Sequence, residues 1–310
     1  GDFKTLALLL GKKKGIGFFN FEKYKESTRQ ALEKYLANPK KFTELEDRKK
    51  IAKLALKTYN ENTLGNIKNK SDEALEKMVV MLFELLRDWQ LITLFSEALD
   101  EEISKTYFDK LGLKINFKEF IGKSSLVDFE SFIFKRNESL LDYNENEPYD
   151  SQWIFTNYLE TPKIENVPKL EKEMMQDLGG KEELEKEQAE LRIIINENRK
   201  QVEDYKKTLD SSAKDLFEFI KSAICLRDIR KEEIYRLLTV LSNGLREIFS
   251  RNKLDPEKII YTLYKDYKSR EYKKENFNEL LSKREKGFLV YFGKNGEEID
   301  YIEFEKAKKS

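Results

Sequence analysis

Residues 216–267 decide the fold, and they have the sequence LFEFIKSAICLRDIRKEEIYRLLTVLSNGLREIFSRNKLDPEKIIYTLYKDY. Their apolar side chains recur at spacings of three and four in two runs, Leu216, Phe219, Ile220, Ala223 and Leu226, then Ile234, Leu237, Leu241, Leu245 and Ile248. This spacing places each run on one stripe of a helix, the pattern of a buried face. The charged residues between the runs indicate a junction between two helices. Asp255 and Pro256 predict a further helix, because a carboxylate favours the N-cap and proline the first helical position.

The composition favours the same fold class for the rest of the chain. Of 310 residues, 39% are hydrophobic and 37% charged, with only 13 glycines and 5 prolines. A chain of this length can bury a large core in one or two domains, and this mixture is typical of long helices with charged outer faces. The 58 basic residues balance the 58 acidic ones. A general nucleic-acid binder would show a basic surplus, so we expect no nucleic-acid partner.

The absence of histidine excludes several kinds of catalytic site. The chain has no histidine and one cysteine, Cys225. It therefore cannot hold a Ser-His-Asp or Cys-His unit, a zinc site of imidazoles or thiolates, or a phosphohistidine. No disulfide can form within the chain, which favours a reducing compartment. Cys225 lies among apolar residues, and a small buried hydrophobe is the simpler interpretation than a reactive thiol. We expect no cofactor, no metal and no catalytic residue.

The N-terminal sequence bears on location. No apolar run has the length of a membrane span, and residues 6–10 are far too few. The start of the chain lacks the charged and then apolar order of a signal peptide, so we expect a cytoplasmic protein with no membrane partner. The first residue is Gly1, which suggests a piece of a longer protein.

The first 142 residues predict a short hairpin followed by helices. Residues 3–19 contain two apolar runs around a Gly-Lys-Lys-Lys-Gly turn, which indicates a β-hairpin. A phosphate-binding loop is the alternative, but the GxxxxGK[ST] motif is absent. Helical patterns follow over residues 21–37, 42–59 and 128–141. Between them, a helix that begins after Ser71 can continue towards Leu111, as one long helix or as two in tandem.

Residues 143–168 form the longest loop that the sequence predicts. The segment contains three prolines and repeated Asn and Asp, and within it lies the aromatic cluster QWIFTNY of residues 152–158. Long loops inside a compact domain are usually functional or disordered, and buried aromatic side chains argue against disorder. The cluster either anchors the loop or lines a ligand pocket.

The remaining residues, 169–310, predict further helices and a closing hairpin. A short helix over residues 169–177 ends at a Gly-Gly pair, and residues 181–209 predict a long helix with one narrow apolar stripe. After the central stretch come a helix over residues 276–286 and a hairpin around an Asn-Gly turn. The expected fold is therefore mainly α, a multi-helix bundle-like domain with short β-hairpins at the N- and C-terminal ends. Segments 1–142, 143–168 and 169–310 can form one compact domain, and the sequence leaves open whether the hairpins pair.

Three segments carry a resemblance to a known family. Residues 225–236, 245–249 and 254–261 have the sequences CLRDIRKEEIYR, LREIF and LDPEKIIY. Together they resemble the helical region before the swivelling phosphohistidine domain of phosphoenolpyruvate-utilising enzymes, which include phosphoenolpyruvate synthase-like proteins and rifampicin phosphotransferases. The likeness covers the latter half of the chain. The chain departs from the full enzymes because it has no ATP-grasp domain, no phosphate-binding glycine loop and no histidine to carry a phosphoryl group.

The resemblance implies a non-catalytic domain that recognises substrate or links the catalytic domains. Its partners would be the ATP-grasp and phosphohistidine domains of a parent protein or complex, with a small-molecule acceptor. We expect no activity from this chain alone. The candidate substrate-binding residues are Trp153 and Tyr158 as pocket walls, with Arg227, Asp228 and Arg230, where the central pattern breaks into charge. Local ion pairs at an exposed helix junction are the simpler interpretation of the last three.

Two other functional classes compete with that interpretation. A stand-alone helical scaffold would bind another protein, and the charged helix over residues 181–209 would present the partner face. An independent enzyme would need an acid/base pair of carboxylates, as in glycosidases, or a Mg²⁺ site. Adjacent carboxylates occur throughout the chain, for example Glu182 with Glu183 and Glu232 with Glu233, so neither pattern is specific. An aromatic pocket beside residues 152–158 would separate the recognition domain from the scaffold.

Overall fold

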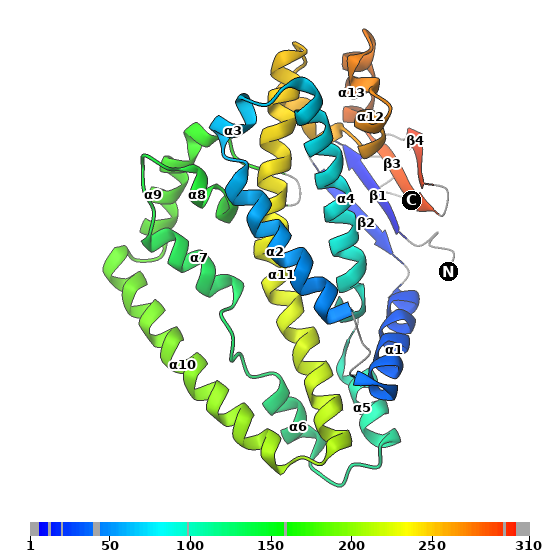
Figure 1. Cartoon of the computed structure of the whole chain (residues 1–310), viewed down its shortest axis with the longest axis vertical. Helices are drawn as coiled ribbons and strands as arrows, with labels where there is room; N and C mark the ends of the chain where they lie inside the picture. Colours follow the sequence, from blue (N-terminus) through cyan, green and yellow to red (C-terminus); the bar gives the residue numbers. More distant parts are fainter. Residues whose placement is uncertain are drawn as a thin grey trace.

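The structure is a computed structural model that describes residues 6–11, 14–19, 21–39, 44–97, 99–157, 160–293 and 296–301. The prediction of a mainly α fold is confirmed (Figure 1). The helices are α1 (Phe21–Ala37), α2 (Glu44–Glu61), α3 (Leu64–Lys68), α4 (Asp72–Glu97), α5 (Glu101–Lys110), α6 (Phe117–Ser124), α7 (Phe132–Leu141), α8 (Tyr149–Gln152), α9 (Val167–Asp177), α10 (Lys181–Thr208), α11 (Ser211–Arg251), α12 (Tyr264–Lys268) and α13 (Phe277–Lys286), with the 3-10 helices η2 (Trp153–Phe155), η3 (Ile164–Asn166), η4 (Pro256–Tyr261) and η5 (Glu271–Lys273).

Helix α11 is the axis of the fold, and it corrects the expectation of two helices joined at a charged junction. It runs unbroken for 41 residues, starting after Asp210, whose carboxylate accepts a hydrogen bond from the Ala213 N–H at 2.9 Å. The charged residues between the two apolar runs are helical, because Arg, Lys and Glu are all good helix formers. These charged residues lie where the helix changes its packing partners, and the helix does not end there.

A close approach between α11 and α4 explains a glycine inside the long helix. Gly244 faces Met78 and Val79 of α4, and a Cβ at this position would lie 2.8 Å from Met78 Cε and 3.2 Å from Val79 Cγ2. Glycine weakens a helix interior by about 1 kcal/mol relative to alanine. Here it allows the two helices to pack closely along the centre of the molecule (Figure 1).

One hydrophobic cluster joins the two halves of the chain. It includes Leu32 and Phe120 from the first half, and Phe217 and Leu281 from the second, all fully buried. The region after Ser71, for which the sequence left open one long helix or two in tandem, forms two helices, α4 and α5. The 143–168 segment is more ordered than a loop, since it contains α8, η2 and η3. Each of these short elements brings side chains onto α11 or α9.

Helix α10 packs against α7 and α6, and it confirms the prediction of a long helix with a narrow buried stripe. Its buried residues are Leu184, Gln188, Ile195 and Val202, which recur on one side of the helix. The Gln188 side chain donates to the Phe134 carbonyl of α7 at 3.2 Å. Figure 1 shows α10 along the outer edge of the molecule, beside α7 and α6.

Among the described residues, four short strands bring an N-terminal and a C-terminal segment together. They are β1 (Leu6–Gly11), β2 (Lys14–Phe19), β3 (Phe288–Gly293) and β4 (Gly296–Tyr301). They form an antiparallel sheet of order β2-β1-β3-β4, in which Leu6 of β1 pairs with Phe292 of β3. Residues 12–13, between β1 and β2, and residues 294–295, between β3 and β4, lie outside the described part of the chain.

A buried ion pair fixes the segment that leads into β3. Arg284 of α13 and Asp266 of α12 are each 1% exposed, and two Arg284 nitrogens reach the Asp266 carboxylate at 2.6 and 2.9 Å. Arg284 also donates to the Tyr261 carbonyl at 2.9 Å, and Asp266 accepts from the Leu263 N–H at 2.8 Å. Asp255 caps its helix as expected, by accepting from the Glu257 N–H at 3.0 Å, but that helix is the short 3-10 helix η4.

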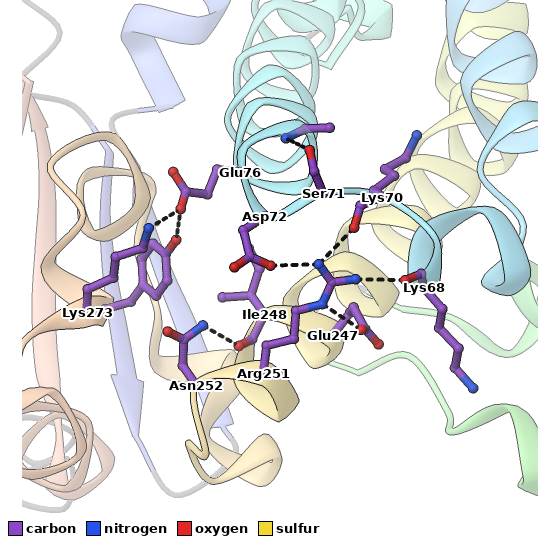
Figure 2. Close-up of polar contacts among 12 residues, drawn as sticks. Lys68, Lys70, Ser71, Asp72, Glu76, Glu247, Ile248, Arg251, Asn252 and Lys273 are labelled. Carbon is purple, nitrogen blue, oxygen red and sulfur yellow. Dashed lines mark hydrogen bonds and ion pairs between the residues drawn. The ribbon is translucent and has the colours of Figure 1, made fainter.

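A second polar cluster ties the end of α11 to the start of α4 (Figure 2). Arg251 donates to the Asp72 carboxylate at 2.7 Å and to the Glu247 carboxylate at 2.8 Å. It also donates to the carbonyl oxygens of Lys70 and Lys68, both at 2.8 Å. The loop between α3 and α4 is therefore held on one guanidinium. These contacts commit the Arg251 guanidinium to holding the fold.

Candidate functional site

The aromatic cluster of residues 152–158 is anchored in the core. Trp153 has no exposed surface, and its ring packs edge-on against Phe132 of α7, with ring centres 5.9 Å apart. The guanidinium of Arg236 on α11 lies 4.5 Å from the centre of the Trp153 ring and 4.8 Å from that of Tyr59 on α2. Cation–π contacts of this kind contribute about 0.5–2 kcal/mol each. Trp153 therefore serves to attach the segment to α11.

Tyr59, which contacts the Arg236 guanidinium, also contacts α8. Its ring stacks on that of Tyr149, with centres 4.8 Å apart. Each phenol donates to backbone of the opposite segment: Tyr59 to the Tyr149 carbonyl, and Tyr149 to the Asn62 carbonyl at 2.9 Å. Burial raises the pKa of both hydroxyls far above the usual value, so both stay protonated donors. The two tyrosines are structural and offer no base for catalysis.

A polar stripe on α11 holds the segment that follows Trp153. Thr239, Asn243 and Arg246 lie at spacings of four and three, on one side of the helix. Thr239 hydrogen-bonds the Thr156 hydroxyl at 2.8 Å, and the Asn243 amide donates to the Gln152 side chain at 2.8 Å. Arg246 donates to the carbonyls of residues 161 and 162. Each of these polar side chains has a partner, so the stripe specifies which segment packs against the helix.

The structure brings together two of the five predicted site residues. Asp228 on α11 accepts a hydrogen bond from the Phe132 N–H at 2.6 Å, and Trp153 packs on the ring of the same phenylalanine. Asp228 thus caps the first turn of α7 from another helix, a role that depends on tertiary packing. Arg227 and Arg230 are half-buried on α11. Tyr158 lies outside the described residues.

The strongest electrostatic feature lies elsewhere, on a surface that we call the acidic edge. It consists of residues 138–190, which contain 15 acidic residues against 5 basic ones, a net charge of −10. The zero net charge of the whole chain concealed it. These residues form the end of α7, then α8 and α9, and the start of α10, which Figure 1 shows together on one side of α11.

Most carboxylates of the acidic edge lack a cation. Among the described residues, Asp142, Glu145, Glu147, Asp150, Glu160, Glu165, Glu171, Asp177, Glu182, Glu185, Glu187 and Glu190 form no ion pair, although Arg236 and Arg246 attract some of them from a greater distance. The lysines of the edge are partly committed already: Lys163 pairs with Glu257 of η4 at 2.9 Å, outside the edge. The negative charge is therefore largely uncompensated at the surface.

Two carboxyl groups of the acidic edge have a raised pKa. Burial, with the neighbouring Glu147 carboxylate, raises the pKa of Asp150. Burial, with the Glu145 carboxylate, likewise raises the pKa of Glu171. In both cases like charge adds to the cost of ionisation.

Metal-ligating clusters and membrane-spanning helices were the remaining features to place. Among the described residues, no group of three or more Asp, Glu, Cys or His side chains is arranged to hold a metal ion. Cys225 is half-buried on α11 and forms no disulfide, since it is the one cysteine of the chain. Within the same residues, no helix is both long and apolar enough to cross a bilayer.

Comparisons with known proteins add no assignment. No family model, no curated protein and no solved structure matches the chain. The candidate site therefore rests on the geometry and charge of the chain's own residues.

Proposed function

We propose that the chain is a helical scaffold that binds a basic protein partner through the acidic edge. The observation that carries this proposal is the uncompensated charge of residues 138–190 on a rigid helical framework. The tight anchoring of residues 152–156 to α11 supports it, because a preformed surface loses little entropy on binding.

The chemistry of the surface selects the class of partner. A field of this sign attracts Lys- and Arg-rich surfaces, speeds their association and repels phosphate backbones. A lysine or arginine beside Asp150 and Glu171 would offset the repulsion from Glu147 and Glu145, which adds to burial in raising the pKa of both groups. A basic protein therefore fits this face, and a nucleic acid does not.

Oligolysine binding to matched charge variants tests the proposal. The edge variant is Glu145→Lys/Glu147→Lys/Asp150→Lys, and the control is Glu22→Lys/Glu275→Lys/Glu279→Lys, which changes the net charge equally at exposed sites elsewhere. We expect the edge variant to bind oligolysine at least about tenfold more weakly than the control variant at low salt. This difference in affinity should narrow as the salt concentration rises. Equal losses in the two variants would show that only net charge matters and would refute the proposal.

The family resemblance supplies a second candidate, a substrate-recognition or linker domain working with separate ATP-grasp and phosphohistidine domains. It is supported by the indole N–H of Trp153, a buried donor with no acceptor among the described residues. Calorimetric titration with rifampicin tests it, because that acceptor belongs to one branch of the family. Binding that is lost in Trp153→Phe, which keeps a ring and removes the donor, would support this role. Absence of binding would count against it for this acceptor class.

A further inference from the structure

The outer face of α10 carries two isoleucines that no described element covers. Ile193 is 59% exposed, the highest value among the large hydrophobic residues of the described chain. Ile194 is 48% exposed, which is also among the highest values. The neighbouring Ile195 is 6% exposed and faces the core. Because successive helical residues are about 100° apart, Ile193 lies on the side of the helix opposite to that buried stripe. Packing within the described part of the chain does not explain why these two side chains are apolar.

Two carboxylates bracket the isoleucines. Glu190 lies three and four residues before them, and Glu197 lies three and four residues after them, so each is one helical turn away on the same face. Neither glutamate takes part in an ion pair among the described residues, whereas the cations Lys186 and Arg192 of the same helix are paired with Glu183 and Glu138. The face thus has an apolar centre and a glutamate one turn away at each end, and Lys186 and Lys200 lie a further turn out.

We propose that this face of α10 is the docking site for a basic amphipathic helix of the partner. The inference rests on the proposed function and deepens it, because it places the partner and specifies its chemistry. The partner helix would bring apolar side chains onto Ile193 and Ile194, and lysines or arginines towards Glu190 and Glu197. Helices that pack side by side use this arrangement, with an apolar seam flanked by opposite charges.

Charge argues against a second copy of the chain as the occupant. An antiparallel copy centred between Ile193 and Ile194 would place Glu190 opposite the copy's Glu197. A parallel copy would place each glutamate opposite itself. Like charges facing each other in an interface are unfavourable, so the face is complementary to a chain of opposite charge pattern.

A synthetic peptide tests the inference. The probe is a helical peptide with two leucines on one face and a lysine one turn away on each side. Its control has the same composition in an order that spreads the leucines around the helix. The apolar variant is Ile193→Ser/Ile194→Ser, matched by Leu54→Ser/Leu56→Ser on α2, where the side chains are 43% and 46% exposed. Fluorescence anisotropy gives Kd, and thermal unfolding followed by circular dichroism shows that each variant is folded.

The expected result is preference for the amphipathic probe, lost by about tenfold or more in the Ile193→Ser/Ile194→Ser variant and unchanged in the α2 control. Glu190→Lys/Glu197→Lys should weaken binding similarly, and Glu275→Lys/Glu279→Lys should not. Unchanged binding in both α10 variants would overturn the docking site. If the Glu145→Lys/Glu147→Lys/Asp150→Lys variant still loses oligolysine in that case, the proposed function stands without it.

Discussion

Removal of Arg284 should be among the most destabilising single changes in the chain. Its side chain is 1% exposed. The guanidinium makes two hydrogen bonds to Asp266 and one to the Tyr261 carbonyl. Breaking a buried pair by removing one partner costs about 3–5 kcal/mol, because the other charge is left unpaired. We therefore expect Arg284→Met to lower the free energy of unfolding by about this amount.

The second variant separates the cost of an unpaired charge from the value of the pair. Replacing both members with apolar residues of similar size is often neutral or stabilising. Asp266→Leu/Arg284→Met should therefore be more stable than Arg284→Met alone, although the Tyr261 carbonyl and Leu263 N–H lose their partners. Urea unfolding followed by circular dichroism measures both. A loss below about 1 kcal/mol in Arg284→Met, or equal losses in the two variants, would refute this reasoning.

Three further predictions concern single residues. Gly244→Leu should lower the free energy of unfolding by about 1–3 kcal/mol in urea titrations, because the larger side chain would overpack against Met78. Gly244→Ala should cost less, because the flexible end of the Met78 side chain can shift to make room for one methyl group. Asp228→Ala should cost about 1 kcal/mol and increase hydrogen exchange at the start of α7, since the Phe132 N–H loses its acceptor. Glu171→Gln should stabilise the fold near pH 7 and not below about pH 4, because a raised pKa in the folded state makes stability fall as pH rises through the carboxyl's range. Thermal unfolding across that range checks the sign.

The sequence predicted the helices through their apolar periodicity, and it failed where periodicity was interrupted by charge. The charged residues around Arg230 favour a helix as strongly as the apolar ones do, so composition alone did not mark the difference between a junction and a half-buried turn of α11. The pairing of β1 with β3 joins residues about as far apart as the chain allows, and no local signal determines such a register.

The candidate site was harder to predict than the fold. Asp228 caps α7 only because α7 and α11 meet there, which the sequence of either helix does not encode. The acidic edge could have been found from sequence, since 138–190 is continuous, but totals over the whole chain average it to zero. The spacing of Thr239, Asn243 and Arg246 was a further signal, because a polar stripe on a buried helix requires partners.

Hydrogen exchange with and without the amphipathic lysine peptide tests the central claim most directly, because it locates the bound partner on the chain. The account predicts slower exchange in α10, centred on the turns that carry Ile193 and Ile194, and no change in α12 and α13. Protection centred on α12 and α13, or spread evenly over the helices, would contradict it.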